Sequence, residues 1–192
     1  DARRTELLVG EVLSLEDEDL IEEEEIVITL TNNGYIKRVA NTEFRAQRRG
    51  GRGVQGMGVH EEDYVQTLIS CSTHDTLLFF TNAGKVYRAK GYEIPEYGRM
   101  AKGIPVINLL GIDSNEQIQT IVPVTKEDQA GTGYLFFTTR LGVVKRTSVT
   151  AFANIRSNGL IAIGLKEDDE LVNVLKTTGS DVMIIGTHTG YS

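Results

Sequence analysis

The sequence predicts an all-β protein, a propeller-like array of four-stranded antiparallel blades. A strand–turn–strand pattern occurs four times, and the turn ends in a glycine each time: Gly34, Gly84, Gly142 and Gly190. These glycines lie 50, 58 and 48 residues apart, and self-similarity at that period is typical of propellers and related repeats. The sequence has no long stretch with the 3.6-residue apolar period that would predict an amphipathic helix instead.

Each repeat begins with a hairpin. Its first strand is an apolar run, which predicts a strand buried on both faces; the runs begin at Ile26, Thr76, Tyr134 and Val182. The x-x-Gly turn that follows needs a positive φ at the glycine. The second strand alternates apolar and basic residues, so one face is expected to pack and the other to meet solvent. The alternating pairs are Ile36/Lys37, Val86/Arg88 and Val144/Lys145.

Two further strands complete each predicted blade. A polar, glycine-bearing loop (40–53, 89–103 or 147–159) leads to an apolar strand, Val54–Val59, Ile104–Leu110 or Leu160–Leu165. An acidic turn then leads to the last strand, Tyr64–Ser70, Gln117–Val124 or Leu171–Lys176. Four strands are the count of a propeller blade. The blades therefore span about 26–75, 76–133 and 134–181, and 182–192 starts a fourth, which predicts an open, partial wheel. The insertion Thr125–Thr132 is expected to be a surface loop.

Residues 1–25 are expected to form a connector, with a short strand over Leu7–Leu15. The chain carries a formal charge of −7, but residues 16–25 hold eight acids and no base. Without them, 19 acids face 20 bases, a net of +1. The acidic run is either a solvated linker or an intramolecular decoy that competes with a polyanion for basic surface.

Catalytic and metal-binding patterns are absent from the sequence. His60, His74 and His188 each fall in a different repeat or at a strand end, and no Cys/His cluster has metal-ligand spacing. His74 lies in a turn between repeats, where a local turn role is expected. Cys71 is the single cysteine and is expected to be buried and inert. Because no disulfide can form within the chain, the cysteine content fits a reducing compartment. No stretch approaches the ~20 apolar residues of a membrane span. No signal peptide is visible, and because the first residue is not Met we expect a fragment or a processed chain.

The segment Gln47-Arg48-Arg49-Gly50-Gly51-Arg52-Gly53 and the recurring bases point to nucleic acid. Glycines let another backbone approach closely, and arginine forks match phosphates bidentately. Bases recur just after each turn glycine, and more lie in the loops, which predicts a basic stripe that follows a duplex backbone without reading bases. The alternatives are a flexible solvated loop and Lys/Arg placed for solubility and edge protection. We name the candidates outside 47–53 the rim cations: Lys37, Arg38, Arg45, Lys85, Arg88, Lys90, Arg99, Lys102, Lys145, Arg146 and Arg156.

The chain resembles the C-terminal domain of the A subunit of bacterial DNA gyrase over essentially its whole length. QRRGGRG at 47–53 is similar to the gyrase box of that family, with Arg52 where Lys is common. DEDLIEEEEIVITLTNNGYIKR just upstream, KGIPVINLL at 102–110, GVVKRT at 142–147 and DARRTE at 1–6 support the resemblance. It implies a β-pinwheel, with strands exchanged between neighbouring blades and a rim that wraps duplex DNA.

The resemblance also implies the surroundings of the chain. The parent enzyme would be an ATP-hydrolysing type II topoisomerase that uses Mg²⁺ and introduces negative supercoils. Its partners would be the gyrase B subunit, together with the catalytic core of the A subunit, in an A2B2 heterotetramer in the bacterial cytoplasm, associated with the chromosome and not with a membrane. No cofactor and no catalytic residue is expected in this chain, and its seven tyrosines are expected to pack rather than to act as nucleophiles.

Two alternatives stay open. A propeller that binds other proteins would share the blade pattern, although WD-type repeats need Trp and the chain has none. The equivalent domain of topoisomerase IV would share the fold but has degenerate boxes, so the intact 47–53 segment favours gyrase.

Overall fold

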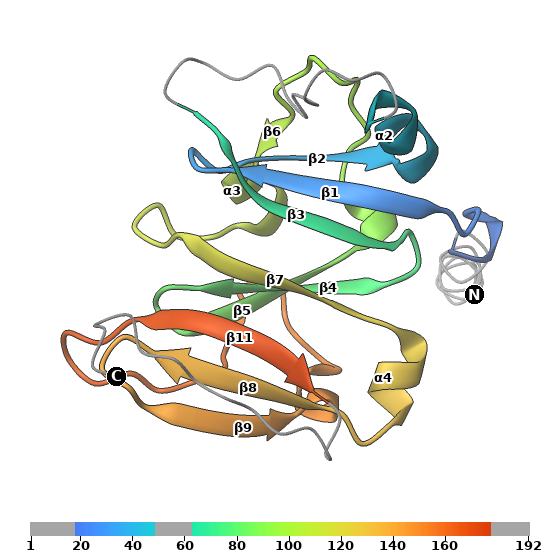
Figure 1. Cartoon of the computed structure of the whole chain (residues 1–192). Helices are drawn as coiled ribbons and strands as arrows, with labels where there is room; N and C mark the ends of the chain where they lie inside the picture. The colour runs from blue at the N-terminus through green and yellow to red at the C-terminus, as the bar shows by residue number, and fades with distance from the viewer. Residues whose placement is uncertain (1–17, 49–62, 178–192) are drawn as a thin grey trace, which may run out of the picture.

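The computed structural model describes residues 18–48 and 63–177 (Figure 1). They form three antiparallel β-sheets, which confirms the all-β prediction. The predicted strands Leu7–Leu15 and Val54–Val59 and the predicted start of a fourth blade at 182–192 lie outside the described residues. None of the helices in the described part is long and apolar enough to cross a membrane.

Three hairpins form where the apolar runs and turn glycines predict them. They pair β1 (Glu25–Thr31) with β2 (Tyr35–Ala40), β4 (Thr76–Thr81) with β5 (Lys85–Lys90), and β8 (Tyr134–Thr139) with β9 (Val144–Ser148). The last strand of each repeat returns antiparallel to the first. These last strands are β3 (Val65–Ser72), β7 (Ile118–Val124) and β11 (Leu171–Thr177).

The fourth strand of a sheet comes from the next repeat along the chain. The strand β6 (Ile104–Pro105) pairs with β2, and β10 (Leu160–Ile161) pairs with β5. The sheet orders are therefore β3-β1-β2-β6, β10-β5-β4-β7 and, for the third sheet, β11-β8-β9. The expectation of four strands from one repeat is wrong in this respect, and the strand exchange that the family resemblance implies is present.

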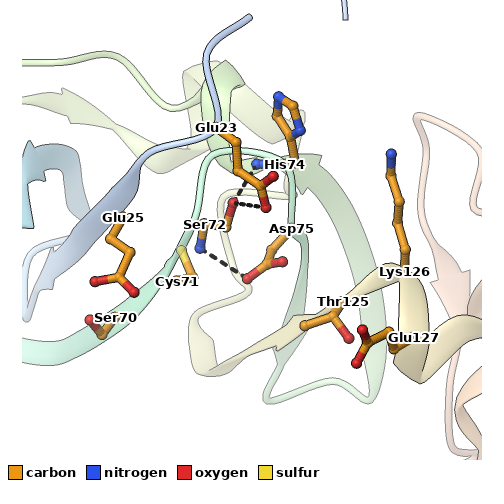
Figure 2. A pocket seen from close by; sticks show the side chains of 10 residues that line it. All are labelled: Glu23, Glu25, Ser70, Cys71, Ser72, His74, Asp75, Thr125, Lys126 and Glu127. Carbon is orange, nitrogen blue, oxygen red and sulfur yellow. Dashed lines mark hydrogen bonds between the residues drawn. The ribbon is translucent and has the colours of Figure 1, made fainter. Parts of the chain in front are cut away.

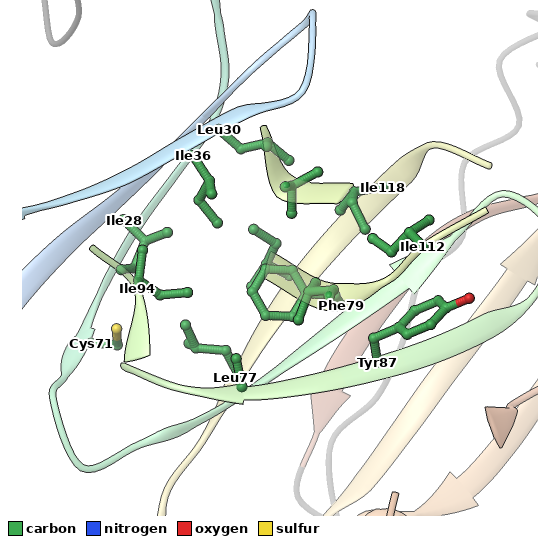
Figure 3. Packing of buried hydrophobic residues seen from close by; sticks show 14 of the residues in the cluster. Ile28, Leu30, Ile36, Cys71, Leu77, Phe79, Tyr87, Ile94, Ile112 and Ile118 are labelled. Carbon is green, nitrogen blue, oxygen red and sulfur yellow. The ribbon is translucent and has the colours of Figure 1, made fainter. Parts of the chain in front are cut away.

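The sheets are stacked face to face, and two apolar clusters fill the layers between them (Figure 1). Between the first and second sheets, Ile28, Leu30 and Ile36 meet Leu77 and Phe79 (Figure 3). Between the second and third sheets, three aromatic rings meet edge-on or tilted, with centroids 5.4–6.1 Å apart: Phe80, Phe137 and Phe152. Alternate side chains of β4 thus enter different clusters, which is why its whole run TLLFFT is apolar or buried.

Short helices replace parts of the predicted loops and strands, although the sequence has no long stretch with a helical apolar period. The loop predicted at 40–53 begins as α2 (Asn41–Arg48), and the insertion 125–132 contains α4 (Lys126–Ala130). The predicted strand Ile104–Leu110 is a strand for two residues and then α3 (Val106–Leu110). Two 3₁₀ turns, η1 (Gly91–Glu93) and η2 (Val149–Phe152), open the loops after β5 and β9.

Local sequence explains these helices. In α4, the Thr125 hydroxyl accepts from the Asp128 amide at 3.0 Å, while the Asp128 carboxylate accepts from the Thr125 amide at 2.9 Å. This reciprocal capping stabilises a helix start. In α3, Gly111 ends the helix in the left-handed region at φ 64°. The exchanged strands β6 and β10 are two residues long each, and α3 begins directly after β6.

Candidate nucleic-acid interface

The three hairpin turns share one geometry, so equivalent residues of the repeats occupy equivalent places. Each turn glycine donates its N–H to the carbonyl of a threonine three residues earlier, at 2.9–3.0 Å. The hydroxyl of that threonine accepts from the amide just beyond the glycine, at 3.0–3.4 Å. The glycines have φ values of 81–87°. The turns are Thr31–Gly34, Thr81–Gly84 and Thr139–Gly142.

An arginine stands four residues beyond each turn glycine and in the same register of each hairpin. Arg38 lies opposite Ile28, Arg88 opposite Leu78 and Arg146 opposite Phe136. Arg88 and Arg146 are exposed, whereas Arg38 is half-buried and its Nε has no hydrogen-bond partner among the described residues. Arg88 donates to the Ala153 carbonyl at 2.9 Å, and the Arg146 guanidinium lies 4.4 Å from the centroid of the Tyr134 ring.

The lysines three residues beyond the turn glycines behave differently from one another. Lys145 is exposed and donates to the Ala162 carbonyl at 3.1 Å. Lys37 is completely buried, and its ammonium group binds three carbonyls of the segment 98–101. The prediction of Lys37 as a rim cation is therefore wrong, because a buried ammonium with all three donors used cannot reach a phosphate.

Two half-buried lysines of β5 have neighbours within the chain. Lys85 lies 5.6 Å from the centroid of the Tyr87 ring, and its pKa is raised, first by the hydrogen bond with Tyr87 and further by the carboxylates of Glu116 and Asp113. Lys90 forms an ion pair with Glu18 at 3.3 Å. Among the described rim cations, Lys90 alone forms an ion pair with a described carboxylate, which would compete with a DNA phosphate.

The loops that precede the exchanged strands carry the remaining described candidates. Arg99 and Arg156 are exposed. Lys102 is half-buried, with its Nζ 4.0 Å from the centroid of the Tyr35 ring. Tyr35 therefore contacts a rim cation, whereas the sequence analysis expected it only to pack. The position of this aromatic residue directly after the turn glycine was the signal that could have indicated the contact.

The 47–53 segment itself is not placed by these observations. Gln47 and Arg48 end the backbone of α2, and the side chains of Arg45, Gln47 and Arg48 are outside the described part. Residues Arg49–Gly53 also lie outside the described residues. Their role in DNA binding stays a prediction.

The acidic run docks on the turn between β3 and β4, which sequence reasoning did not foresee. The Thr73 hydroxyl donates to the Glu22 carbonyl at 2.9 Å and accepts from the Glu24 amide at 3.0 Å. The ring Nε2 of His74 lies 2.7 Å from the Ile21 carbonyl. A pocket of about 530 Å³ opens beside this turn, and most of its lining side chains are acidic or carry a hydroxyl (Figure 2). The Ser72 hydroxyl donates to the Glu23 carboxylate, and the Ser72 amide donates to the Asp75 carboxylate. The connector from Glu22 onward is therefore fixed to the first sheet.

The His, Cys, Asp and Glu side chains of the described residues form no candidate metal site. Within residues 18–48 and 63–177, no group of three or more His, Cys, Asp or Glu side chains could hold a metal ion. Cys71 is buried, and burial together with the Asp75 carboxylate raises its pKa to about 12, so the thiol stays protonated. His74 has a turn role, as its position predicts.

Comparisons with known proteins agree with this geometry. The family model "DNA gyrase C-terminal domain, beta-propeller" matches residues 25–72, 75–125 and 133–178. The chain is 67% identical over 190 residues to the DNA gyrase A subunit of Streptococcus pyogenes serotype M1, covering 99% of this chain and 23% of that protein. It is 65% identical over 192 residues to the corresponding protein of Streptococcus pneumoniae, again covering 23% of the relative.

Solved structures show the same fold. The chain aligns with the C-terminal domain of a DNA topoisomerase IV with a TM-score of 0.68 at 30% identity, over 83% of this chain and 48% of that one. It aligns with a DNA gyrase A C-terminal domain with a TM-score of 0.60 at 26% identity, over 81% and 49%. The repeated hairpins, the exchanged strands and the three matched segments place this chain in the family of DNA gyrase C-terminal domains with the β-propeller fold.

Proposed function

We propose that this chain binds and wraps duplex DNA, without regard to base sequence, as part of a DNA gyrase. One observation carries the proposal. Among the cations whose side chains the structure describes, only Lys90 and Lys176 form ion pairs with described carboxylates. Five exposed rim cations of the second and third repeats are therefore left to attract a polyanion: Arg88, Arg99, Lys145, Arg146 and Arg156.

Wrapping follows from cations spread over successive blades. Smoothly bending a site of 20–30 bp by 40–90° costs on the order of 1–6 kcal/mol. Several phosphate contacts along an arc can offset that cost, and each contact releases counterions, so binding weakens as salt rises. Because phosphates carry no base identity, the affinity is the same for unrelated sequences. The 47–53 segment would hold the duplex as it completes its turn.

The chain spans about a quarter of the length of the gyrase A subunits that it matches, so the activity and partners of the whole protein are proposed from these relatives. A wrapped duplex would present a second DNA segment to strand passage, which the gyrase B subunit would drive with ATP and Mg²⁺. The assembly would be an A2B2 heterotetramer in the bacterial cytoplasm, on the chromosome. The 67% identity to a gyrase A subunit, together with the intact 47–53 segment, favours gyrase over topoisomerase IV.

The direct test is binding and wrapping by the 192-residue chain. Fluorescence anisotropy on two unrelated linear duplexes should give equal affinities and a strong, equal dependence on salt. Relaxing a closed circular plasmid with the chain bound, and then removing the protein, should leave a changed linking number. A salt-independent affinity, or no affinity for duplex DNA, would favour a propeller that binds proteins.

A further inference from the structure

Lys37 is a charged residue in a fully buried place. Its Nζ lies 3.0 Å from the carbonyl oxygen of Gly98, 2.9 Å from that of Arg99 and 3.1 Å from that of Ala101. An ammonium group has three donors, and each finds an acceptor here. Burial lowers the pKa of Lys37, and the three carbonyl dipoles replace the water that the charge has lost.

The bound carbonyls belong to a different repeat. Residues 98–102 lead into β6 of the second repeat, whereas Lys37 lies in β2 of the first. Gly103 follows at φ 88°, and a Cβ there would lie 2.3 Å from the Ile36 carbonyl oxygen. With Lys102 over the Tyr35 ring, three consecutive residues of β2 hold this segment.

The same segment carries rim cations and corresponds in position to the gyrase box. Gly103 and Gly159 each precede an exchanged strand. Gly53 precedes the apolar run Val54–Val59 in the same way. Counting back from the glycine, Arg99 and Lys102 take the positions of Arg49 and Arg52. Arg99 is exposed, as is its neighbour Met100 at 70%.

We propose that Lys37 is a positioning residue for DNA binding: by binding three carbonyl oxygens of the segment 98–101, it holds Arg99 and Lys102 ready to contact two phosphates. An ammonium that draws the carbonyls inward leaves the side chains of Arg99 and Met100 exposed, while Lys102 is half-buried beside Tyr35. A segment already held in its binding conformation loses less conformational entropy when DNA binds. The inference rests on the proposed function, since it explains how a buried first-repeat residue shapes a second-repeat contact.

The test compares Lys37→Met with two references in the 192-residue chain, by anisotropy on a linear duplex over a range of salt. Arg99→Ala/Lys102→Ala should lower the slope of log affinity against log salt by about 1.8, because each of the two lost phosphate contacts contributes about 0.9. Lys37→Met should lower it by a similar amount and should change affinity less than about twofold when added to the double variant. Lys145→Met is the matched control, because Lys145 has the same place beyond its turn glycine but is exposed. Its loss should add fully to that of the double variant.

A local measurement separates positioning from folding. The Ala101 amide donates to the Gly98 carbonyl at 3.1 Å, so its hydrogen exchange reports the shape of the segment. In Lys37→Gln, which keeps a side-chain donor, exchange at 98–102 should accelerate while exchange in β8 stays unchanged, and the salt slope should lie between those of the parent and Lys37→Met. The Gln variant decides the question if the Met variant does not fold.

Three results would overturn the inference. An unchanged slope and unchanged exchange in both Lys37 variants would show that the segment holds its shape without the lysine. A Lys37→Met effect that adds fully to Arg99→Ala/Lys102→Ala would show that Lys37 acts elsewhere. If the double variant itself binds DNA with an unchanged slope, the segment is not a DNA contact, and the proposed function then depends on the other rim cations.

Discussion

Gly159 lies directly against the ring of Tyr87. A Cβ at position 159 would be 2.9 Å from Tyr87 Cε1, 3.1 Å from Cζ and 3.1 Å from the Val86 carbonyl oxygen. The ring cannot move aside freely, because Tyr87 is buried and its hydroxyl donates to the Glu116 carboxylate at 3.0 Å. The exchanged strand β10 begins at the next residue, so this contact joins the third repeat to the second sheet.

We predict that Gly159→Ala destabilises the chain more than Gly142→Ala does. Both glycines have a positive φ, 81° and 87°, which costs any L residue about 1–2 kcal/mol. Only at Gly159 does the added methyl also overpack, by about 1–3 kcal/mol. Urea unfolding measures both changes. Equal free energies of unfolding in the two variants would mean that the Tyr87 contact gives way without cost.

The same contact shows where prediction from sequence succeeds and where it stops. The hairpins are predictable because their signal is local, an apolar run and a glycine at a fixed distance. The sheets that β6 and β10 join cannot be predicted, because the residues of either strand carry no local signal for their pairing partner. Helix α4 has its capping residues in the sequence, at Thr125 and Asp128, but a five-residue helix is too short to show an apolar period.

Lys37 shows the same limit in the candidate site. Alternation along β2 predicts a solvent-facing lysine, and alternation describes a strand by itself. The segment 98–101, which arrives from the next repeat, covers that face and turns an expected contact into a buried support. Arg88, Arg99, Lys145, Arg146 and Arg156 are exposed as a rim requires, since no segment of the described part covers them.

The stability of the chain should fall at acidic pH through Asp128. Burial alone would raise the pKa of this carboxyl, but the Lys176 ammonium at 2.7 Å and the Thr125 amide hold the pKa below 3.8. A depressed pKa in the folded state stabilises the fold at pH values above the unfolded pKa of 3.8, and this contribution is lost as pH falls through the folded pKa.

Asp128→Asn should therefore lower the free energy of unfolding by about 1 kcal/mol at pH 7 and by almost nothing at pH 2. Urea midpoints at the two pH values measure this, with the exposed neighbour Glu127→Gln as a control; a cost for Asp128→Asn that is the same at both pH values would exclude the linkage.

The acidic run should weaken DNA binding. Glu18 already pairs with Lys90, and the segment that begins at Glu22 is bound to Thr73 in the turn between β3 and β4. Replacing Glu22–Glu25 by glutamine should tighten binding at low salt by up to about fivefold, the size of one exposed ion pair. Glu18→Gln should do the same through Lys90 alone, and not in a Lys90→Met background. Anisotropy at low ionic strength checks both variants, and an unchanged affinity in both would identify the run as an ordinary linker.

The last prediction concerns the 47–53 segment in the intact parent enzyme. Arg48→Ala, Arg49→Ala and Arg52→Ala together should abolish negative supercoiling while ATP-dependent relaxation largely survives. The rim cations supply most of the attraction and stay in place, whereas the segment grips the duplex where it must finish its wrap.

If each of these arginines neutralises one phosphate, the salt slope should fall by roughly 2.7, from about 0.9 per contact. Affinity should drop equally for unrelated sequences, because phosphates carry no base identity. Gel assays of supercoiling and relaxation on the same plasmid separate wrapping from catalysis, and Arg140→Ala, at an exposed residue outside the proposed rim, serves as the control for loss of one positive charge. Supercoiling at the normal rate by the triple variant would refute the assignment of the segment as the wrapping element, and an unchanged slope would show that its arginines never reach the phosphates.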